Sequence, residues 1–192
     1  MKSKPIGLTL TLMILVLVVS LSNNSDLKIK SYEDIKDENL INNNELKSSA
    51  FSERIHIDNN WTAAKIAGIC TGNGNYSDPY VIEDLVIDGH GSGICLSIEN
   101  TNMRFMVLNC TFFSSGDSPV YNFVGILLTN VSNGQFINNN CLFNSYGIYL
   151  DDSSANNITG NNVANSHFGI NIYNGELNTV SNNNVSNNDY GI

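Results

Sequence analysis

GILLTNVSNGQFINNNCLFNSY (125–146), GIYLDDSSANNITGNNVANSHF (147–168) and GINIYNGELNTVSNNNVSNNDY (169–190) are three consecutive blocks of 22 residues. Each begins with a glycine, and a fourth glycine follows the last block at the same interval: Gly125, Gly147, Gly169 and Gly191. A fixed period in this range indicates a solenoid, in which each repeat is one structural unit stacked on its neighbours.

Apolar residues recur at four positions of each block. They lie one, three, eleven and sixteen residues after the glycine: Ile126, Leu128, Phe136 and Cys141; Ile148, Leu150, Ile158 and Val163; Ile170, Ile172, Val180 and Val185. The alternation of the first two is typical of a strand, and stacked coils bury such residues in a continuous core. We therefore predict an all-β, right-handed parallel β-helix with 22-residue coils and three short strands per coil. Helical repeats are disfavoured because Gly, Asn, Ser and Asp interrupt every apolar run.

Two further positions predict ladders along the stack. An asparagine lies fifteen residues after each glycine, at Asn140, Asn162 and Asn184, where stacked side-chain amides can hydrogen-bond at a turn. An aromatic residue precedes each following glycine, and these rings should also stack: Tyr146, Phe168 and Tyr190.

An earlier coil is expected to start at Gly93. In this alignment Ile94 and Leu96 match the first strand, and Phe105 and Cys110 match the later inward positions if one residue is inserted. The interval to Gly125 is ten residues too long, and we place the excess in a polar loop within 114–124.

The N-terminal part divides into three segments. Residues 1–22 read as a signal peptide or an N-terminal membrane anchor, with Lys2 and Lys4 before an apolar run. Residues 23–50 are expected to be a polar spacer, and 51–92 an N-terminal cap, with a short helix near Trp61, plus first strands. The coils occupy 93–192 and stop two residues into a new repeat, so we expect a β-helix truncated at its C-terminus.

The charge distribution disfavours some classes of binding partner. The net charge is −9, and Arg104 is the only basic residue after Lys65. Phosphate-binding surfaces need Lys and Arg, so nucleic acid is disfavoured, and a strongly anionic polysaccharide is disfavoured with it. Membrane contact is expected only through the N-terminal segment, and the oligomeric state stays open.

GIYLDDSSANNITGN (147–161) resembles the parallel β-helix repeats of the NosD-like family, which is named for a periplasmic copper-associated protein. DPYVIEDLVIDG (78–89), followed by GICLSIENTNMRFMVLNCTF (93–112), looks like multi-coil surface proteins of archaea. The resemblance implies an exported β-helix, secreted or on the cell surface. It implies little about activity, because such repeats occur in lyases, hydrolases, epimerases and adhesins.

Catalytic candidates come from a second resemblance. Gly89-His90-Gly91 resembles the G-H-G of polygalacturonases, and Asp151-Asp152 resembles their adjacent aspartates. The order along the chain is reversed and two to three coils separate the two motifs. The other interpretation is a glycine-rich turn and a polar strand end.

The sequence supports a metal site only weakly. We expect His56, His90 and His167 on different coils, and Met103 and Met106 on opposite faces of a strand, so no copper site is predicted. Calcium is the alternative cofactor, with oxygen ligands from Asp84, Asp88 and Asp117, although a solvated acidic surface explains the same residues.

The four cysteines suit an oxidising compartment. Cys70 and Cys95 are candidates for a disulfide joining the cap to the first coil. Cys110 and Cys141 are expected at the same inward position of successive coils, as a disulfide or as stacked free thiols.

The leading functional hypothesis is a non-catalytic surface protein that binds carbohydrate or mediates adhesion, with surface glycans or polysaccharide as partners. Tyr149 and Tyr173 could stack on sugar rings, although they follow their glycines by two and four residues and so are not in register. One alternative is a polysaccharide-active enzyme whose catalytic coil lies beyond Ile192. Another is a copper accessory protein of the NosD type.

Overall fold

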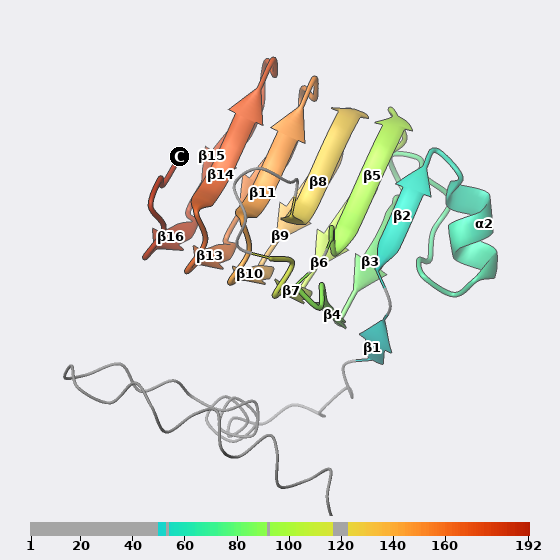
Figure 1. The fold of residues 1–192 in the computed structure, drawn as a ribbon. Helices are drawn as coiled ribbons and strands as arrows, with labels where there is room; N and C mark the ends of the chain where they lie inside the picture. Colours follow the sequence, from blue (N-terminus) through green and yellow to red (C-terminus); the bar gives the residue numbers. More distant parts are fainter. Residues whose placement is uncertain (1–49, 53, 92, 117–122) are drawn as a thin grey trace, which may run out of the picture. The chain divides into compact units, whose positions relative to one another are not determined.

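The computed structural model describes residues 50–52, 54–91, 93–116 and 123–192, which fold as a parallel β-helix (Figure 1). The predicted fold class is thereby confirmed. The segments predicted as signal or anchor and as spacer lie almost wholly outside the described residues; a first strand, β1 (Ala50–Ser52), begins at the last spacer position. Among the described residues, no helix has the length and apolar character needed to cross a bilayer.

Each coil contributes one strand to each of three parallel sheets. The first sheet contains β2 (Ile55–Asp58), β5 (Leu96–Thr101), β8 (Val124–Val131), β11 (Tyr146–Asp151) and β14 (Phe168–Tyr173). The second contains β3 (Tyr80–Glu83), β6 (Phe105–Leu108), β9 (Gly134–Ile137), β12 (Asn157–Thr159) and β15 (Thr179–Ser181). The third contains β1, β4 (Leu85–Asp88), β7 (Thr111–Phe113), β10 (Asn140–Leu142), β13 (Asn162–Ala164) and β16 (Asn184–Ser186).

The strand register follows the 22-residue period from β8 onward. Ile148 lies between Ile126 and Ile170, and all three side chains point into the core. The inward rows from the three sheets meet in one hydrophobic cluster along the solenoid. Stacking is therefore what buries them, since a single coil has no partner surface.

The first full coil departs from the predicted alignment by two residues. Leu96, not Ile94, lies opposite Ile126, and Ile98 lies opposite Leu128. Cys95 therefore occupies the position that Gly125 holds in the next coil. Residues two apart on a strand face the same side, so a shift of two leaves the apolar pattern unchanged.

The later inward positions of that coil were also assigned wrongly. Val107 lies opposite Phe136, whereas Phe105 lies opposite Gly134. The Phe105 ring fills the space beside Gly134, where an added Cβ would meet it at 2.5 Å. Phe112, not Cys110, is the neighbour of Cys141.

The corners between sheets are built by asparagines. In the corner between the second and third sheets, Asn161 Oδ1 accepts the N–H of Asn139, and Asn161 Nδ2 donates to the Phe136 carbonyl, both at 2.9 Å. Asn183 makes the equivalent bonds one coil further on, to the Asn161 N–H and the Ile158 carbonyl. We call residues that bind the preceding coil in this way clamp asparagines: Asn139, Asn144, Asn156, Asn161, Asn178, Asn183 and Asn188.

The two predicted ladders are present. Asn162 Nδ2 donates to Asn140 Oδ1 at 3.3 Å, and Asn184 Nδ2 donates to Asn162 Oδ1 at 2.9 Å, although these residues begin strands of the third sheet. The rings of Tyr146 and Phe168 stack at 4.7 Å between centroids, and those of Phe168 and Tyr190 at 4.9 Å.

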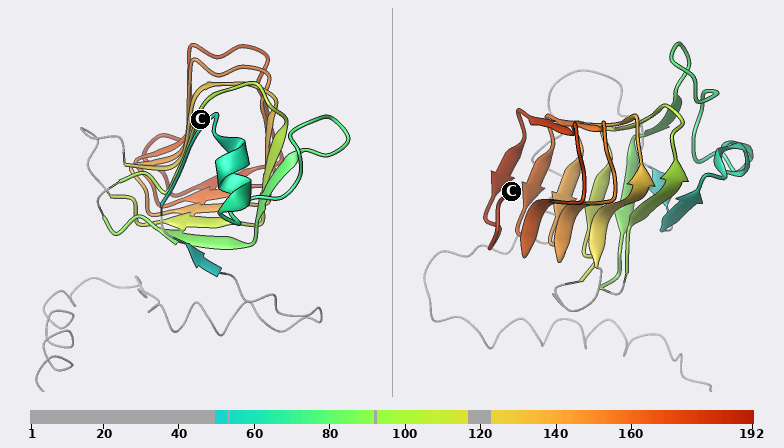
Figure 2. Two further views of the ribbon diagram at one scale, coloured as in Figure 1. Left: turned by 90° about the vertical axis from the view of Figure 1, so that its right-hand side faces the viewer. Right: turned by 90° about the horizontal axis from the view of Figure 1, so that it is seen from above.

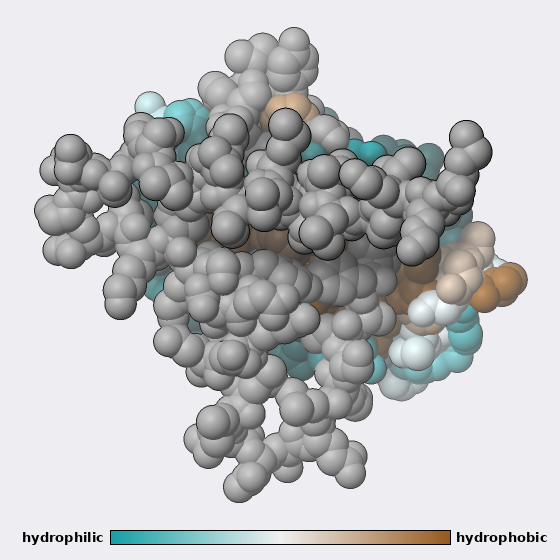
Figure 3. Space-filling view, turned by 60° about the horizontal axis from the view of Figure 1, so that its bottom comes forward, coloured by the Kyte–Doolittle hydropathy of each residue, from teal (hydrophilic) through white to brown (hydrophobic). Residues whose placement is uncertain are grey.

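The N-terminal end of the core is covered by the helix α2 (Trp61–Ile66), as predicted for the cap (Figure 2). Trp61 is 2% exposed, stacks on Tyr80 at 4.9 Å and donates from Nε1 to Thr101 Oγ1. The opposite face of α2 meets solvent, where Ile66 is 84% exposed. Figure 3 shows apolar surface at the end of the molecule that carries α2 in Figure 1.

Candidate functional site

The outer surface of the first sheet holds the candidate sugar-binding residues. Tyr149 and Asp151 alternate along β11 with the buried Ile148 and Leu150, so they project outward. Tyr173 ends β14 and is 58% exposed.

These residues form one patch although the two tyrosines are out of register, as predicted. Tyr149 pairs with Asn171, and Asp151 pairs with Tyr173. Neighbouring strands are about 4.8 Å apart and alternate residues about 6.7 Å apart, so the two tyrosines are diagonal neighbours separated by about 8 Å. Tyr146 joins them, because its ring lies 5.1 Å from that of Tyr149. We call Tyr146, Tyr149, Asp151 and Tyr173 the tyrosine patch.

The electrostatics of Tyr149 reflect this grouping. The pKa of the Tyr149 phenol is raised, and partial burial is the largest cause. The negative charge of Asp151 raises this pKa further, and Tyr146 and Tyr173 have smaller effects in the same direction. The phenol therefore stays protonated at neutral pH and can both donate and accept hydrogen bonds.

The faces of the rings differ in availability. Tyr146 and Phe168 stack on each other within the aromatic ladder, and Tyr149 packs against Tyr146. Tyr173 has no ring partner among the described residues, so its exposed face is the one open to a ligand. Sugars stack their C–H faces on such rings, in the same way as other apolar groups.

An acidic row runs from the tyrosine patch toward the N-terminal end of the same surface. Asp58, Glu99, Thr129 and Asp151 lie side by side on successive strands. Glu99 Oε1 accepts from Ser97 Oγ at 2.8 Å and lies 3.1 Å from His56 Nε2. Carboxylates are acceptors, which suits a ligand rich in hydroxyl donors and repels an anionic one.

The polygalacturonase-like residues are not brought together. His90 follows β4, at the corner between the third and first sheets, and is 80% exposed. Asp151 and Asp152 lie at the corner between the first and second sheets, three coils further on. His90 instead belongs to a local turn, in which its N–H donates to Asp88 Oδ1 at 2.8 Å.

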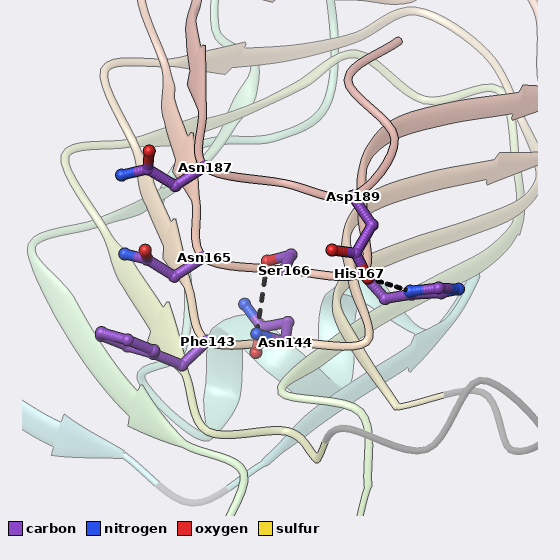
Figure 4. Close-up of a pocket in the computed structure, with 7 residues that line it drawn as sticks. All are labelled: Phe143, Asn144, Asn165, Ser166, His167, Asn187 and Asp189. Carbon is purple, nitrogen blue, oxygen red and sulfur yellow. Dashed lines mark hydrogen bonds and ion pairs between the residues drawn. The ribbon is translucent and has the colours of Figure 1, made fainter. Parts of the chain in front are cut away.

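A shallow groove of about 430 Å³ runs along the corner between the third and first sheets near the C-terminal end (Figure 4). Its lining repeats with the coils: Phe143, Asn165 and Asn187; Asn144 and Ser166; His167 and Asp189. His167 Nδ1 lies 2.6 Å from Asp189 Oδ2, which orients the imidazole. The His167 ring projects away from Ser166, so these residues do not assemble a nucleophile and a base.

No group of three or more His, Cys, Asp or Glu side chains that could hold a metal ion occurs in the described part of the chain. His56 and His90 share a coil, contrary to the prediction, but they lie on β2 and after β4, in different sheets. Met103 precedes β6 and packs on the core, while Met106 lies on β6. Asp84 and Asp88 lie beside or in β4, and Asp117 lies outside the described residues.

The cysteines are four free, buried thiols, so Cys70 and Cys95 are not joined. Cys70 Sγ points to the Trp61 carbonyl in the cap, whereas Cys95 Sγ points to the Phe113 carbonyl in the first full coil. Burial is the main cause that raises the pKa of Cys95 to about 12 and that of Cys110 to about 11.

Two sets of residues were missed from the sequence. Three of the clamp asparagines, Asn139, Asn161 and Asn183, lie one residue before the predicted ladder. The sequence alone did not indicate which asparagine of each adjacent pair faces inward. Tyr146 was assigned only to the aromatic ladder, and its contact with Tyr149 depends on the path of the chain at the corner.

A family profile described as "Periplasmic copper-binding protein (NosD)" matches residues 77–192. No curated protein and no solved structure matches the chain.

Proposed function

Because the chain belongs to the NosD family, described as periplasmic copper-binding proteins, we propose that it is an exported, non-catalytic β-helix protein that binds carbohydrate through its first sheet. The family description supports export. The repeat architecture supports binding, because a solenoid presents an extended surface with side chains at a regular spacing.

The observation that carries the proposal is the tyrosine patch. The open ring of Tyr173 supplies a stacking face, and Tyr149 and Asp151 supply a phenol and a carboxylate beside it. A sugar needs this combination, since it has apolar C–H faces and hydroxyls at its rim.

The charge of the surface selects the ligand class. Asp58, Glu99 and Asp151 lie in one row of the first sheet, and His56 Nε2 lies 3.1 Å from Glu99 Oε1 beside that row. We therefore assign a neutral polysaccharide rather than a uronate chain. The row and the patch together extend over all five strands, which suits a linear chain lying across the coils.

Tyr173→Ala tests the proposal directly, with binding measured by affinity electrophoresis in gels containing neutral polysaccharides such as xylan, mannan or mixed-linkage glucan. We expect the loss of the stacking face to weaken binding at least about tenfold, or about 1.4 kcal/mol. Tyr149→Phe, which removes only the phenolic hydroxyl, should weaken it less.

Tyr76→Ala is the matched control, because Tyr76 is 84% exposed but lies in the loop between α2 and β3. It should leave affinity unchanged. The proposal is wrong if the natural chain is retarded by none of the neutral polysaccharides, or if Tyr76→Ala and Tyr173→Ala weaken binding equally.

Copper binding is the second candidate function, favoured by the family description. The described residues do not fit a copper site, since the three histidines each face a single carboxylate: His56 with Glu99, His90 with Asp88, and His167 with Asp189. Equilibrium dialysis of the full chain against Cu(II), and against Cu(I) under reductant, decides the matter. Stoichiometric uptake would support this function.

A further inference from the structure

The sequence contains the Asn-x-Ser/Thr pattern, which accepts N-linked glycans in exported proteins, at seven asparagines. They are Asn23, Asn60, Asn75, Asn109, Asn130, Asn157 and Asn184. Asn23 lies outside the described residues. An enzyme that modifies the asparagine must take all three residues of the pattern into its own cleft. The surroundings of the middle residue therefore decide which patterns are accessible in the folded protein.

Five of the six described patterns have a middle residue that packs in or against the core. Trp61, Cys110, Val131 and Ile158 are each at most 2% exposed. Val185, in the pattern of Asn184, is partly buried and packs against the same cluster. Withdrawing any of these three-residue segments from the surface would expose an apolar side chain to water, which opposes modification of the folded chain.

Two of these five asparagines also use the nitrogen that would carry the glycan. Asn130 Nδ2 donates to Asn100 Oδ1 at 3.0 Å, and Asn184 Nδ2 donates to Asn162 Oδ1 at 2.9 Å. A glycan on either nitrogen would have to replace a hydrogen bond between coils.

The sixth pattern, residues 75–77, lies in the loop between α2 and β3, which projects from the coils (Figure 2). All three residues are exposed, and the middle one, Tyr76, is 84% exposed. The contact of its ring is an exposed one, with the Arg104 guanidinium 5.0 Å from the centroid. The loop is closed behind this tip by the Asn73 N–H, which donates to the Asp78 carbonyl at 3.0 Å. The tip can therefore enter another protein's cleft while the core stays intact.

The tip also places the two reacting side chains of the pattern together. Asn75 Oδ1 accepts both the N–H and the Oγ–H of Ser77 at 3.0 Å, and the N–H of Asp78 at 2.9 Å. This is an Asx turn, in which an asparagine side chain bonds to the backbone two residues on. Asn75 Nδ2 has no partner in the described part of the chain. The hydroxyl that the pattern requires is thus already at the carboxamide, and the nitrogen is available.

We infer that Asn75 is the site of an N-linked glycan, and that it is the one described Asn-x-Ser/Thr pattern that accepts a glycan after folding. The donor class is an oligosaccharide linked to a polyprenyl diphosphate. Asn75 Nδ2 forms a bond to the anomeric carbon of the first sugar and loses one proton. The bond from that carbon to the diphosphate oxygen breaks, and the polyprenyl diphosphate leaves with the electron pair. The inference requires export of the chain but not carbohydrate binding by the first sheet.

The test incubates the folded full chain with a purified oligosaccharyltransferase and a polyprenyl-diphosphate-linked oligosaccharide, both first shown to glycosylate a free peptide of residues 73–79. Mass spectrometry under denaturing conditions, which removes sugar that is only bound, then measures the occupancy of each asparagine. We expect occupancy at Asn75 at least about tenfold above that at any other described pattern, because the others become accessible only when part of a coil detaches. A chain unfolded in urea before the reaction should be modified at several patterns.

Variants of the loop separate the pattern from the loop itself. Asn75→Gln and Ser77→Ala should each abolish the modification of the folded chain, whereas Ser77→Thr, which keeps the hydroxyl, should retain it. Asn109→Gln is the matched control and should leave the modification unchanged. The inference is overturned if the folded chain carries no glycan on Asn75, if Asn109 or another pattern is occupied equally, or if Ser77→Ala is modified as well as the natural chain.

Discussion

At the scale of single residues, asparagines that are adjacent in the sequence have different structural roles. Asn161 is fully buried and bridges two coils, whereas the adjacent Asn162 is half-buried and forms the outer ladder. A buried N–H that loses its acceptor costs more than an exposed hydrogen bond contributes, because water cannot replace the missing partner.

Asn161→Ala should therefore lower the free energy of unfolding by about 2–4 kcal/mol, since it removes the acceptor of the buried Asn139 N–H and a donor to the Phe136 carbonyl. Asn162→Ala, the matched control, should cost less than about 1 kcal/mol. Urea unfolding followed by circular dichroism measures both. If the two variants lose the same free energy of unfolding, burial of the side-chain amide does not increase its contribution to stability.

The buried thiols give stability a pH dependence. The pKa of Cys95 is raised to about 12 and that of Cys110 to about 11, from 9.0. Above pH 9 the unfolded chain loses these protons while the folded chain keeps them, so folding stability declines as the pH rises from 9 through 11 to 12.

Unfolding at pH 8, 9 and 10 should thus show a free energy that is steady up to about pH 9 and then falls. A Cys95→Ala, Cys110→Ala double variant should have a shallower fall, because the remaining thiols contribute a smaller slope. Identical slopes in the two proteins would assign the alkaline loss to other groups.

At the scale of elements, the glycines that begin the 22-residue blocks let adjacent coils approach each other closely. A Cβ at Gly147 would overlap Val163 Cγ1 and lie 2.7 Å from the Gly169 carbonyl oxygen. Gly191 occupies the same position of the repeat. The atom nearest to a Cβ added there would be Val185 Cγ1, at 4.0 Å.

Gly147→Ala should consequently destabilise the fold by about 1–3 kcal/mol through overpacking, whereas Gly191→Ala should be nearly neutral. Thermal unfolding of the two variants gives the comparison. A neutral Gly147→Ala would mean that β11 and β14 can separate without cost.

The alignment of the first coil was the part of the fold that pattern matching could not resolve. Leu96 and Ile98 face inward, and so do residues displaced from them by two, because side chains alternate with a period of two. The choice depends on Phe105, whose ring needs the space beside Gly134, and on Cys95, which takes the glycine position. Such complementarity exists only between coils.

At the scale of the whole molecule, each coil contacts only its neighbours, so stability should vary along the stack. The N-terminal end is covered by Trp61, while β15 and β16 are largely half-exposed. Strands in the middle, such as β8, have almost all side chains buried.

Amide hydrogen exchange should accordingly be slowest in β5, β8 and β11 and fastest in β15 and β16. Trp61 is the only tryptophan, so its fluorescence reports on the capped end alone. We expect the Trp61 fluorescence to change at a higher urea concentration than that at which the amides of the last coil lose their protection from exchange. Uniform protection across all coils would instead mean that the solenoid opens only as a unit.

The sequence by itself determined the β-helix, its 22-residue period, the inward rows from Gly125 onward, the aromatic and outer asparagine ladders, and the helical cap at Trp61. These follow from local periodicity, which one chain displays along its length. Only the tertiary structure decided that Asn161 rather than Asn162 clamps the coils, that Cys70 and Cys95 remain apart, and that Tyr149, Asp151 and Tyr173 share one patch. Each depends on which residues from different coils lie opposite one another, and that register is set by packing in the core.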